Sequence, residues 1–260
     1  MQQQTNSEVR WEWIGQGWEL FIKQWQNWVV MALVAAVVFI VISIPFYAFI
    51  FGAEFAASRS RDANGISALA GGASILVRLV FQVIFSVVSA LLSAGFYQAA
   101  FKQLRGEQVS VSDIAGTFQY LGPILGAAII IGILQGIGTI LCLIPGFIVA
   151  GLFMFTFPLI VERNLGMFDA MSASIEVAKK NLVMFTLFAI VVQFLIPMAG
   201  VFACCVGMLV AYPLIFLINA CAYRDCFGLD GTMSNNTYTP PPPPNYGGYE
   251  PPPPPPSSWQ

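Results

Sequence analysis

Residues 121–162 read LGPILGAAIIIGILQGIGTILCLIPGFIVAGLFMFTFPLIVE, and no charged side chain occurs before the final glutamate. A bilayer core about 30 Å thick is crossed by a helix of about 20 apolar residues, so this stretch is long enough for two crossings. Residues 143–146 contain a proline and a glycine, which are typical turn residues. A broken re-entrant segment is the alternative, but the length favours a tight hairpin of two spanning helices.

The rest of the chain continues this pattern. The composition is 57% hydrophobic and 9% charged, whereas a soluble domain has about 25% charged residues, so the outer surface must face lipid. The fifth and sixth apolar stretches are joined around residues 197–200. The sequence predicts an all-α fold, a polytopic membrane helical bundle with six transmembrane helices arranged as three hairpins. The expected spans are 28–51, 75–101, 121–142, 145–162, 182–199 and 201–223.

Two segments flank this transmembrane domain, which we place at residues 28–228. Residues 1–27 lack the continuous apolar core of a signal peptide, so the first span is expected to be retained as an anchor. Residues 229–260 are rich in proline, which predicts a disordered cytoplasmic tail in the polyproline II form. Residues 11–25 predict an amphipathic helix in the membrane interface, because apolar side chains recur at three- and four-residue spacing. These are Trp11, Ile14, Trp18, Phe21, Ile22 and Trp25, and Trp13 and Trp28 add to the tryptophan content typical of interfaces.

Basic residues are distributed unevenly between the two sides of the predicted membrane. Lysine and arginine gather on the cytoplasmic side of membrane proteins. One side holds Arg59 and Arg61, and Arg78 lies within a span. We therefore expect a protein of the bacterial cytoplasmic (inner) membrane with both termini in the cytoplasm, since an even number of spans places the termini on one side. The other side holds Arg10, Lys23, Lys102, Arg105, Arg163, Lys179, Lys180 and Arg224.

Short motifs recur along the chain and predict three repeated units, each an amphipathic helix followed by a hairpin. The first unit is longer than the others, and we place its extra residues in a long connection between Gly52 and Gly72. Chance similarity among apolar sequences is the alternative. The recurring residues are Glu19 and Lys23 with Glu176 and Lys180, Asp113 with Asp169, and residues 157–160 with 212–215.

The second expected span carries a polar stripe along one helix face. Its residues recur every three or four positions, and Tyr97 continues them. Ionisable residues within a span are costly and often mark a transport path or a lipid-headgroup site. The structural alternative is that serines pack helices closely while Arg78 extends to the outer interface. The stripe consists of Arg78, Gln82, Ser86, Ser89 and Ser93.

Other residues within the spans have structural roles as their default interpretation. Amides buried in a membrane bind neighbouring helices by hydrogen bonds, although they also occur in substrate sites. Small residues four positions apart let helices approach closely, and a proline kinks its helix because it lacks an N–H. The candidates are Gln135, Gln193 and Asn219 for interhelical contacts, Gly132 and Gly136 for packing, and Pro158 and Pro213 for kinks.

Few residue types suited to catalysis are present. The chain contains no histidine, the commonest general base and metal ligand. No carboxylate lies deep in a span, and there is no phosphate loop or nucleophile–base pair. We expect no catalytic residues, metal or cofactor, and the net charge of −2 gives no reason to expect a nucleic-acid partner. Cys142 could pair with Cys204 or Cys205, but cysteine as a small packing side chain is favoured.

Several of these motifs resemble a group of uncharacterised bacterial integral membrane proteins. That group is related to the membrane domain attached to some glycerophosphodiester phosphodiesterases. The resemblance covers about residues 11–225 and implies a six-helix bundle with interfacial helices, with no catalytic residues to carry over. It depends on GWE at 17–19 with Lys23, LIPG at 143–146, PLIV at 158–161, Ala170 with Ser174, and KKN at 179–181.

Two functions follow as hypotheses. The leading one is a non-enzymatic scaffold, accessory or assembly subunit of a membrane complex, because a full membrane bundle carries no recognisable chemistry. Its partners would be membrane lipids and a protein bound in the membrane or at the proline-rich tail. The alternative is a transporter or channel for lipid or small solute along the polar face of the second span.

Overall fold

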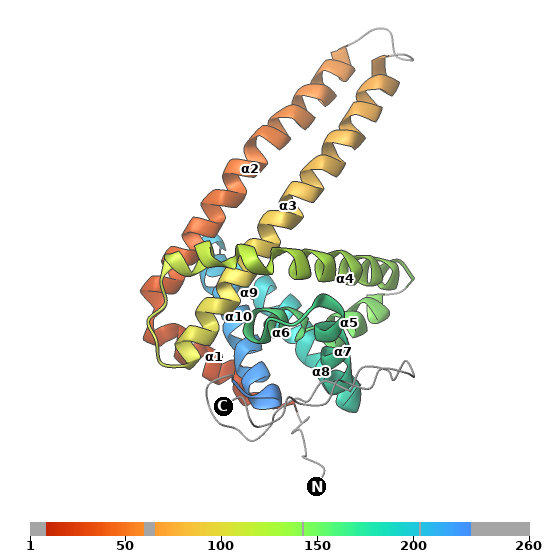
Figure 1. The fold of residues 1–260 in the computed structure, drawn as a ribbon. Coiled ribbons are helices and arrows are strands. Elements are labelled where there is room, and N and C mark those ends of the chain that lie inside the picture. The colour runs from red at the N-terminus through yellow and green to blue at the C-terminus, as the bar shows by residue number, and fades with distance from the viewer. Residues whose placement is uncertain (1–8, 60–65, 142, 203, 230–260) are drawn as a thin grey trace, which may run out of the picture.

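Figure 1 shows the computed structural model, which describes residues 9–59, 66–141, 143–202 and 204–229. Within these ranges every regular element is helical, and six segments are long and apolar enough to cross a membrane. The prediction of an all-α protein with six membrane spans is therefore confirmed. The candidate spans are Trp25–Gly52, Val80–Leu104, Val111–Leu141, Ile144–Arg163, Met167–Phe202 and Gly207–Phe227.

The helices pair as three hairpins, each preceded by a shorter helix. The first hairpin is α2 (Trp25–Arg59) with α3 (Ile66–Leu104), and the second is α4 (Leu121–Leu141) with α5 (Leu143–Leu152) and α6 (Thr156–Arg163). The third pairs α8 (Leu182–Ile190), the π-helix η3 (Val191–Leu195) and α9 (Ile196–Phe202) with α10 (Cys204–Phe227). The preceding helices are α1 (Glu12–Lys23), the 3-10 helix η1 (Val111–Tyr120), and α7 (Met167–Ala178) with the 3-10 turn η2 (Lys179–Asn181).

Backbone features recur at the offsets seen in the sequence. The chain turns from α1 into α2 at Gln24, with φ −134° and ψ 34°. It turns into α8 at Asn181 with the similar values φ −142° and ψ 58°. Asp113 and Asp169 both lie in the first turn of their helices. These equivalences support the three-unit interpretation.

The first hairpin is longer than predicted. The expected connection between Gly52 and Gly72 is mostly helical, since α2 continues to Arg59 and α3 begins at Ile66. Alanine, the best helix former, is frequent on both sides. The helices contain 35 and 39 residues, which at about 1.5 Å per residue exceeds the thickness of a bilayer core. Figure 1 shows them side by side, projecting beyond the other hairpins, with α4 lying across.

The turns of the other hairpins differ from those predicted, because the expected turn prolines lie inside helices. Helix α4 ends at Leu141 and α5 begins at Leu143, so Pro145 falls in the first turn of α5. A proline is tolerated there because the N–H it lacks would have no intrahelical acceptor. Pro197 lies within α9, which ends at Phe202.

Glycines allow the two helices of the second and third hairpins to approach closely, but these are not the glycines predicted from the sequence. A Cβ placed on Gly132 or Gly136 would meet nothing within 4 Å, because this stripe of α4 faces outward. A Cβ on Gly138 would instead lie 2.9 Å from the nitrogen of Gly146. One on Gly200 would lie 3.0 Å from the carbonyl oxygen of Gly207.

The largest buried side chains belong to one continuous core that includes residues from all three units. The outer faces of α2 and α4 carry exposed aliphatic side chains, as expected of surfaces that contact lipid. Trp13 and Trp28, which the sequence placed in the interface, are fully buried in the core. The core's largest members include Trp13, Trp28, Phe96, Phe101, Phe155, Phe185, Phe188 and Tyr223.

Two sequence predictions fall outside the described residues, wholly or in part. Of the proline-rich tail predicted at 229–260, only Leu229 is described, and the first eight residues of the chain are likewise not described. Cys142 and the side chains of Cys204 and Cys205 are also outside the description, so the possible disulfide stays a prediction.

Candidate functional site

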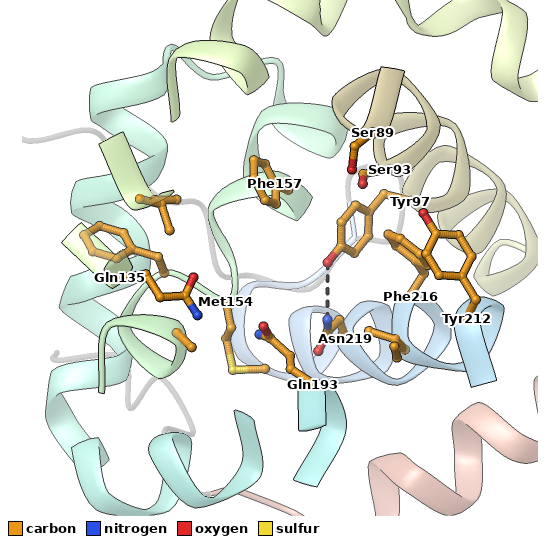
Figure 2. Close-up of a pocket in the computed structure, with 14 residues that line it drawn as sticks. Ser89, Ser93, Tyr97, Gln135, Met154, Phe157, Gln193, Tyr212, Phe216 and Asn219 are labelled. Atoms are coloured by element: carbon orange, nitrogen blue, oxygen red, sulfur yellow. Dashed lines mark hydrogen bonds between the residues drawn. The ribbon is translucent and has the colours of Figure 1, made fainter. Parts of the chain in front are cut away.

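A cavity of about 310 Å³ lies between the hairpins. Its volume is at the lower end of the range of small-molecule sites, about 300–1,000 Å³. The serines of the second span and the three intramembrane amides, which the sequence singled out separately, meet here (Figure 2). The polar lining consists of Ser89, Ser93, Tyr97, Gln135, Gln193, Tyr212 and Asn219.

The C-terminal half of the polar stripe predicted on α3 lines the cavity. Ser89, Ser93 and Tyr97 are four residues apart and therefore share one helix face. Gln82 is exposed and Ser86 is half-buried, and neither lines the cavity. Arg78 lies on α3, but its side chain is outside the described part of the structure. The polar path along the whole stripe is thus reduced to its C-terminal half.

Asn219 and Tyr97 form the floor of the cavity. The Nδ2 of Asn219 on α10 donates a hydrogen bond to the hydroxyl of Tyr97 on α3 over 3.2 Å (Figure 2). Both side chains are buried, and the Oδ1 of Asn219 accepts no hydrogen bond from any described residue. A buried acceptor without a partner costs about 1–3 kcal/mol. The floor therefore presents a polar atom that a bound molecule would satisfy.

Gln193 reaches the cavity from the π-helix η3. The N–H of Ile196 donates to the carbonyl of Val191, five residues earlier, as in a π-helix. Pro197 follows directly, and it has no N–H for the carbonyl of Gln193 four residues before it. Such π segments often occur at functional sites, because they change which side chains face inward. The proline thus helps to position Gln193.

The mouth of the cavity lies at η3, where the lining reaches the surface of the protein. Gln193 is exposed and Gln135 is half-buried, and neither amide side chain bonds to another described residue. Phe194 and Leu195, which follow Gln193 in η3, are exposed and apolar. The mouth therefore lies in a surface that suits contact with lipid tails, whereas the floor is shielded.

A break between helices α5 and α6 forms another wall of the cavity. Residues 153–155 separate α5 from α6, one turn before Pro158. Pro158 cannot donate to the carbonyl four residues earlier, so the helix is interrupted at the predicted kink. Pro213, by contrast, lies within α10, which continues through it. The break turns Phe153, Met154 and Phe157 toward the cavity.

Ser174 on α7 stabilises this break. Its hydroxyl donates to the carbonyl of Leu152 over 2.7 Å and accepts from the N–H of Phe155 at 3.3 Å. Both backbone groups lose helical partners at the break. Sequence reasoning missed this role, because nothing in the spacing of Ser174 shows that it faces an interrupted helix.

Among the residues that the structure describes, no charged side chain lines the cavity. In the described ranges, no group of histidine, cysteine, aspartate or glutamate could hold a metal ion. An ion without a compensating charge is costly to bury. The arrangement is therefore suited to hydrogen bonding with an uncharged molecule.

A second polar assembly joins the helices at the end that carries the basic residues. Lys102 pairs with Asp113 at 2.6 Å, and Arg105 pairs with Glu162. The guanidinium of Arg163 donates to the carbonyl of Phe227. These contacts connect α3 with η1, α3 with α6, and α6 with α10. They hold the three units together at this end of the bundle.

Comparisons with known proteins identify distant relatives. The chain is 28% identical over 156 residues to the uncharacterized protein Mb2590 of Mycobacterium bovis and to the uncharacterized protein Rv2560 of Mycobacterium tuberculosis. The match covers 60% of this chain and 47% of each relative, so the chain spans about half the length of the curated relatives it matches. No family model matches the chain, and no solved structure matches it. The resemblance to the phosphodiesterase membrane domain stays a prediction.

Proposed function

We propose that this membrane protein binds a small uncharged molecule in the cavity between its hairpins and moves it across or within the bilayer. The observation that carries the proposal is the convergence of polar side chains from four spans on one cavity. These are Ser93, Gln135, Gln193 and Asn219. Polar groups within a span are costly and often mark a substrate path. The uncharged lining favours a carrier or channel for neutral molecules over an ion-coupled pump.

The test is flux through vesicles that contain the full chain. Swelling in gradients of urea, glycerol and erythritol would be followed by light scattering. We expect at least one solute to enter faster than into empty vesicles. Ser93→Trp, which fills the cavity, should reduce the rate to that of empty vesicles, and Ser89→Leu should act in the same direction.

Gln82→Trp is the matched control. Gln82 lies on the same helix as Ser93 but is exposed and does not line the cavity. It should leave the flux unchanged. If Ser93→Trp protein is folded and still conducts like the unmodified chain, the cavity is not the path.

A second candidate is a non-enzymatic scaffold or accessory subunit of a membrane complex. Two observations favour it. Ion pairs and a hydrogen bond of Arg163 hold the three units together at one end. The projecting hairpin has an exposed apolar face, which includes Val37, Val41 and Ile44. Purification in mild detergent would then give a stoichiometric membrane partner. Val37→Ser with Val41→Ser should release that partner, whereas Ser93→Trp should retain it.

We further propose the bacterial cytoplasmic membrane as the location, with both termini in the cytoplasm. The uneven distribution of lysine and arginine supports this orientation. The contacts of Lys102, Arg105 and Arg163 support it too, because these basic residues lie together at one end.

A further inference from the structure

We infer that the cavity selects an uncharged molecule that carries a hydroxyl or primary amide group, and that this molecule enters sideways through the mouth at η3. The inference rests on the proposed function and specifies its substrate class. Its basis is the two hydrogen-bonding groups at the cavity floor that have no partner among the described residues, the O–H of Tyr97 and the Oδ1 of Asn219.

The floor presents one donor and one acceptor side by side. The hydroxyl of Tyr97 accepts from Asn219, so its own O–H remains able to donate. The Oδ1 of Asn219 is an acceptor without a partner in the described structure, and the residue is only 3% exposed. Reversing the amide exchanges the two roles but still leaves one donor and one acceptor. A hydroxyl or a primary amide matches both, because each contains a donor and an acceptor in one group.

The lining also excludes charged groups. In the described lining, the polar side chains are those of serine, tyrosine, glutamine and asparagine. A carboxylate, phosphate or ammonium group would lose its hydration without gaining an opposite charge. The expected ligand is therefore neutral at the part that reaches Tyr97 and Asn219.

The position of the mouth indicates how the ligand enters. Phe194 is 51% exposed and Leu195 is 43% exposed, and both follow Gln193 in η3. A molecule with an apolar tail can rest its tail on such a surface while its polar group occupies the cavity. A free polyol has the same hydroxyl chemistry without the tail, and the experiment must separate these two sources.

Binding to the purified full chain would be measured by native mass spectrometry. The probes are dioctanoylglycerol, free glycerol and dioctanoyl phosphatidic acid, which has the same tails as the first probe and a charged phosphate. We expect dioctanoylglycerol to bind and phosphatidic acid not to bind. Binding of glycerol alone would retain the hydroxyl chemistry and make the source a soluble polyol.

Two variants test the floor. Tyr97→Phe removes one oxygen atom and preserves packing, and Asn219→Leu removes the amide. Each should weaken binding about threefold to tenfold, as expected for the loss of one neutral hydrogen bond. Tyr223→Phe is the control, because Tyr223 is a buried tyrosine that does not line the cavity.

The inference is overturned if Tyr97→Phe binds the hydroxyl probes as well as the unmodified chain, or if phosphatidic acid binds more tightly than dioctanoylglycerol. Solute flux that Ser93→Trp still blocks would then leave the proposed function intact. If neither hydroxyl probe binds and Ser93→Trp alters no flux, the cavity holds only water, and both the inference and the proposed function are wrong.

Discussion

At the scale of single residues, tryptophans of one segment have different roles because only some find an acceptor. The indole N–H of Trp13 donates to the Oδ2 of Asp225 at 2.8 Å, and that of Trp28 donates to the Oε1 of Gln103 at 2.7 Å. Both rings are fully buried, whereas Trp18 and Trp25 are about half-exposed. A buried indole needs a partner for its N–H. Exposed tryptophans need none from the protein, and they suit the membrane interface.

Trp28→Phe should lower the free energy of unfolding by about 1–3 kcal/mol, because the buried Oε1 of Gln103 loses its donor. Unfolding in detergent, followed by circular dichroism, would measure the change. Trp18→Phe is the control and should have little effect. Equal losses in the two variants would show that the hydrogen bond to Gln103 is not the cause.

Two glycines of α1 provide a second comparison. A Cβ on Gly17 would lie 2.6 Å from the Cγ1 and 3.2 Å from the nitrogen of Ile218, whereas one on Gly15 would meet nothing within 4 Å. Gly17→Ala should therefore destabilise the docking of α1 on α10 by about 1–3 kcal/mol. Gly15→Ala should be neutral or stabilising by up to about 1 kcal/mol, because alanine favours helix. The melting temperatures of the two variants in detergent would check this order, and the reverse order would contradict it.

At the scale of elements, interruptions of the helices determine the walls of the cavity. Pro158 breaks the span that contains α5 and α6, and Pro197 follows the π segment that carries Gln193. Each proline removes one backbone donor, and the freed groups need other partners in a medium without water. At the first break the partner is Ser174. At both sites, an irregular turn of the helix lies just before the proline.

Ser174→Ala should destabilise the fold by about 1–3 kcal/mol, because the carbonyl of Leu152 and the N–H of Phe155 both lose their partner. Ser172→Ala is the matched control on the same helix. Its hydroxyl donates to the carbonyl of Asp169 at an exposed site, so its loss should cost little. Chemical denaturation in detergent would measure the stability of both variants. A Ser174→Ala protein as stable as the control would mean that the break needs no cap.

At the scale of the whole molecule, the three units are joined at one end and differ in length at the other. The ion pairs of Lys102 with Asp113 and of Arg105 with Glu162 connect separate units. The first hairpin projects past the others at the opposite end (Figure 1). The two ends of the bundle therefore differ: contacts between units hold one end, and the first hairpin extends furthest at the other.

The proposed orientation predicts where an impermeant maleimide reacts in intact cells. In a chain without its natural cysteines, Gly52→Cys should be labelled from outside, because Gly52 is exposed on the projecting hairpin. Ser112→Cys, which is exposed on η1, should react only after the cells are permeabilised. Labelling in the opposite pattern would reverse the orientation.

The class of protein, the number of spans and the polar residues within the spans could all be predicted from the sequence. Apolar length decides membrane crossing, and each helix satisfies its own backbone, so these features can be read locally. Ser89, Ser93, Gln135, Gln193 and Asn219 were all recognisable as polar residues in apolar surroundings.

Which of these residues meet depends on how the helices pack and could not be predicted from the sequence. The faces that helices present to each other depend on crossing geometry and on breaks, which no local pattern specifies. Gly132 and Gly136 have the spacing of a packing motif but face outward, whereas Gly138 and Gly200 make the close contacts. Gln82 shares a stripe with Ser89 but lies outside the cavity. The pairing of Asn219 with Tyr97, which are 122 positions apart, is a property of the packed helices and of nothing shorter.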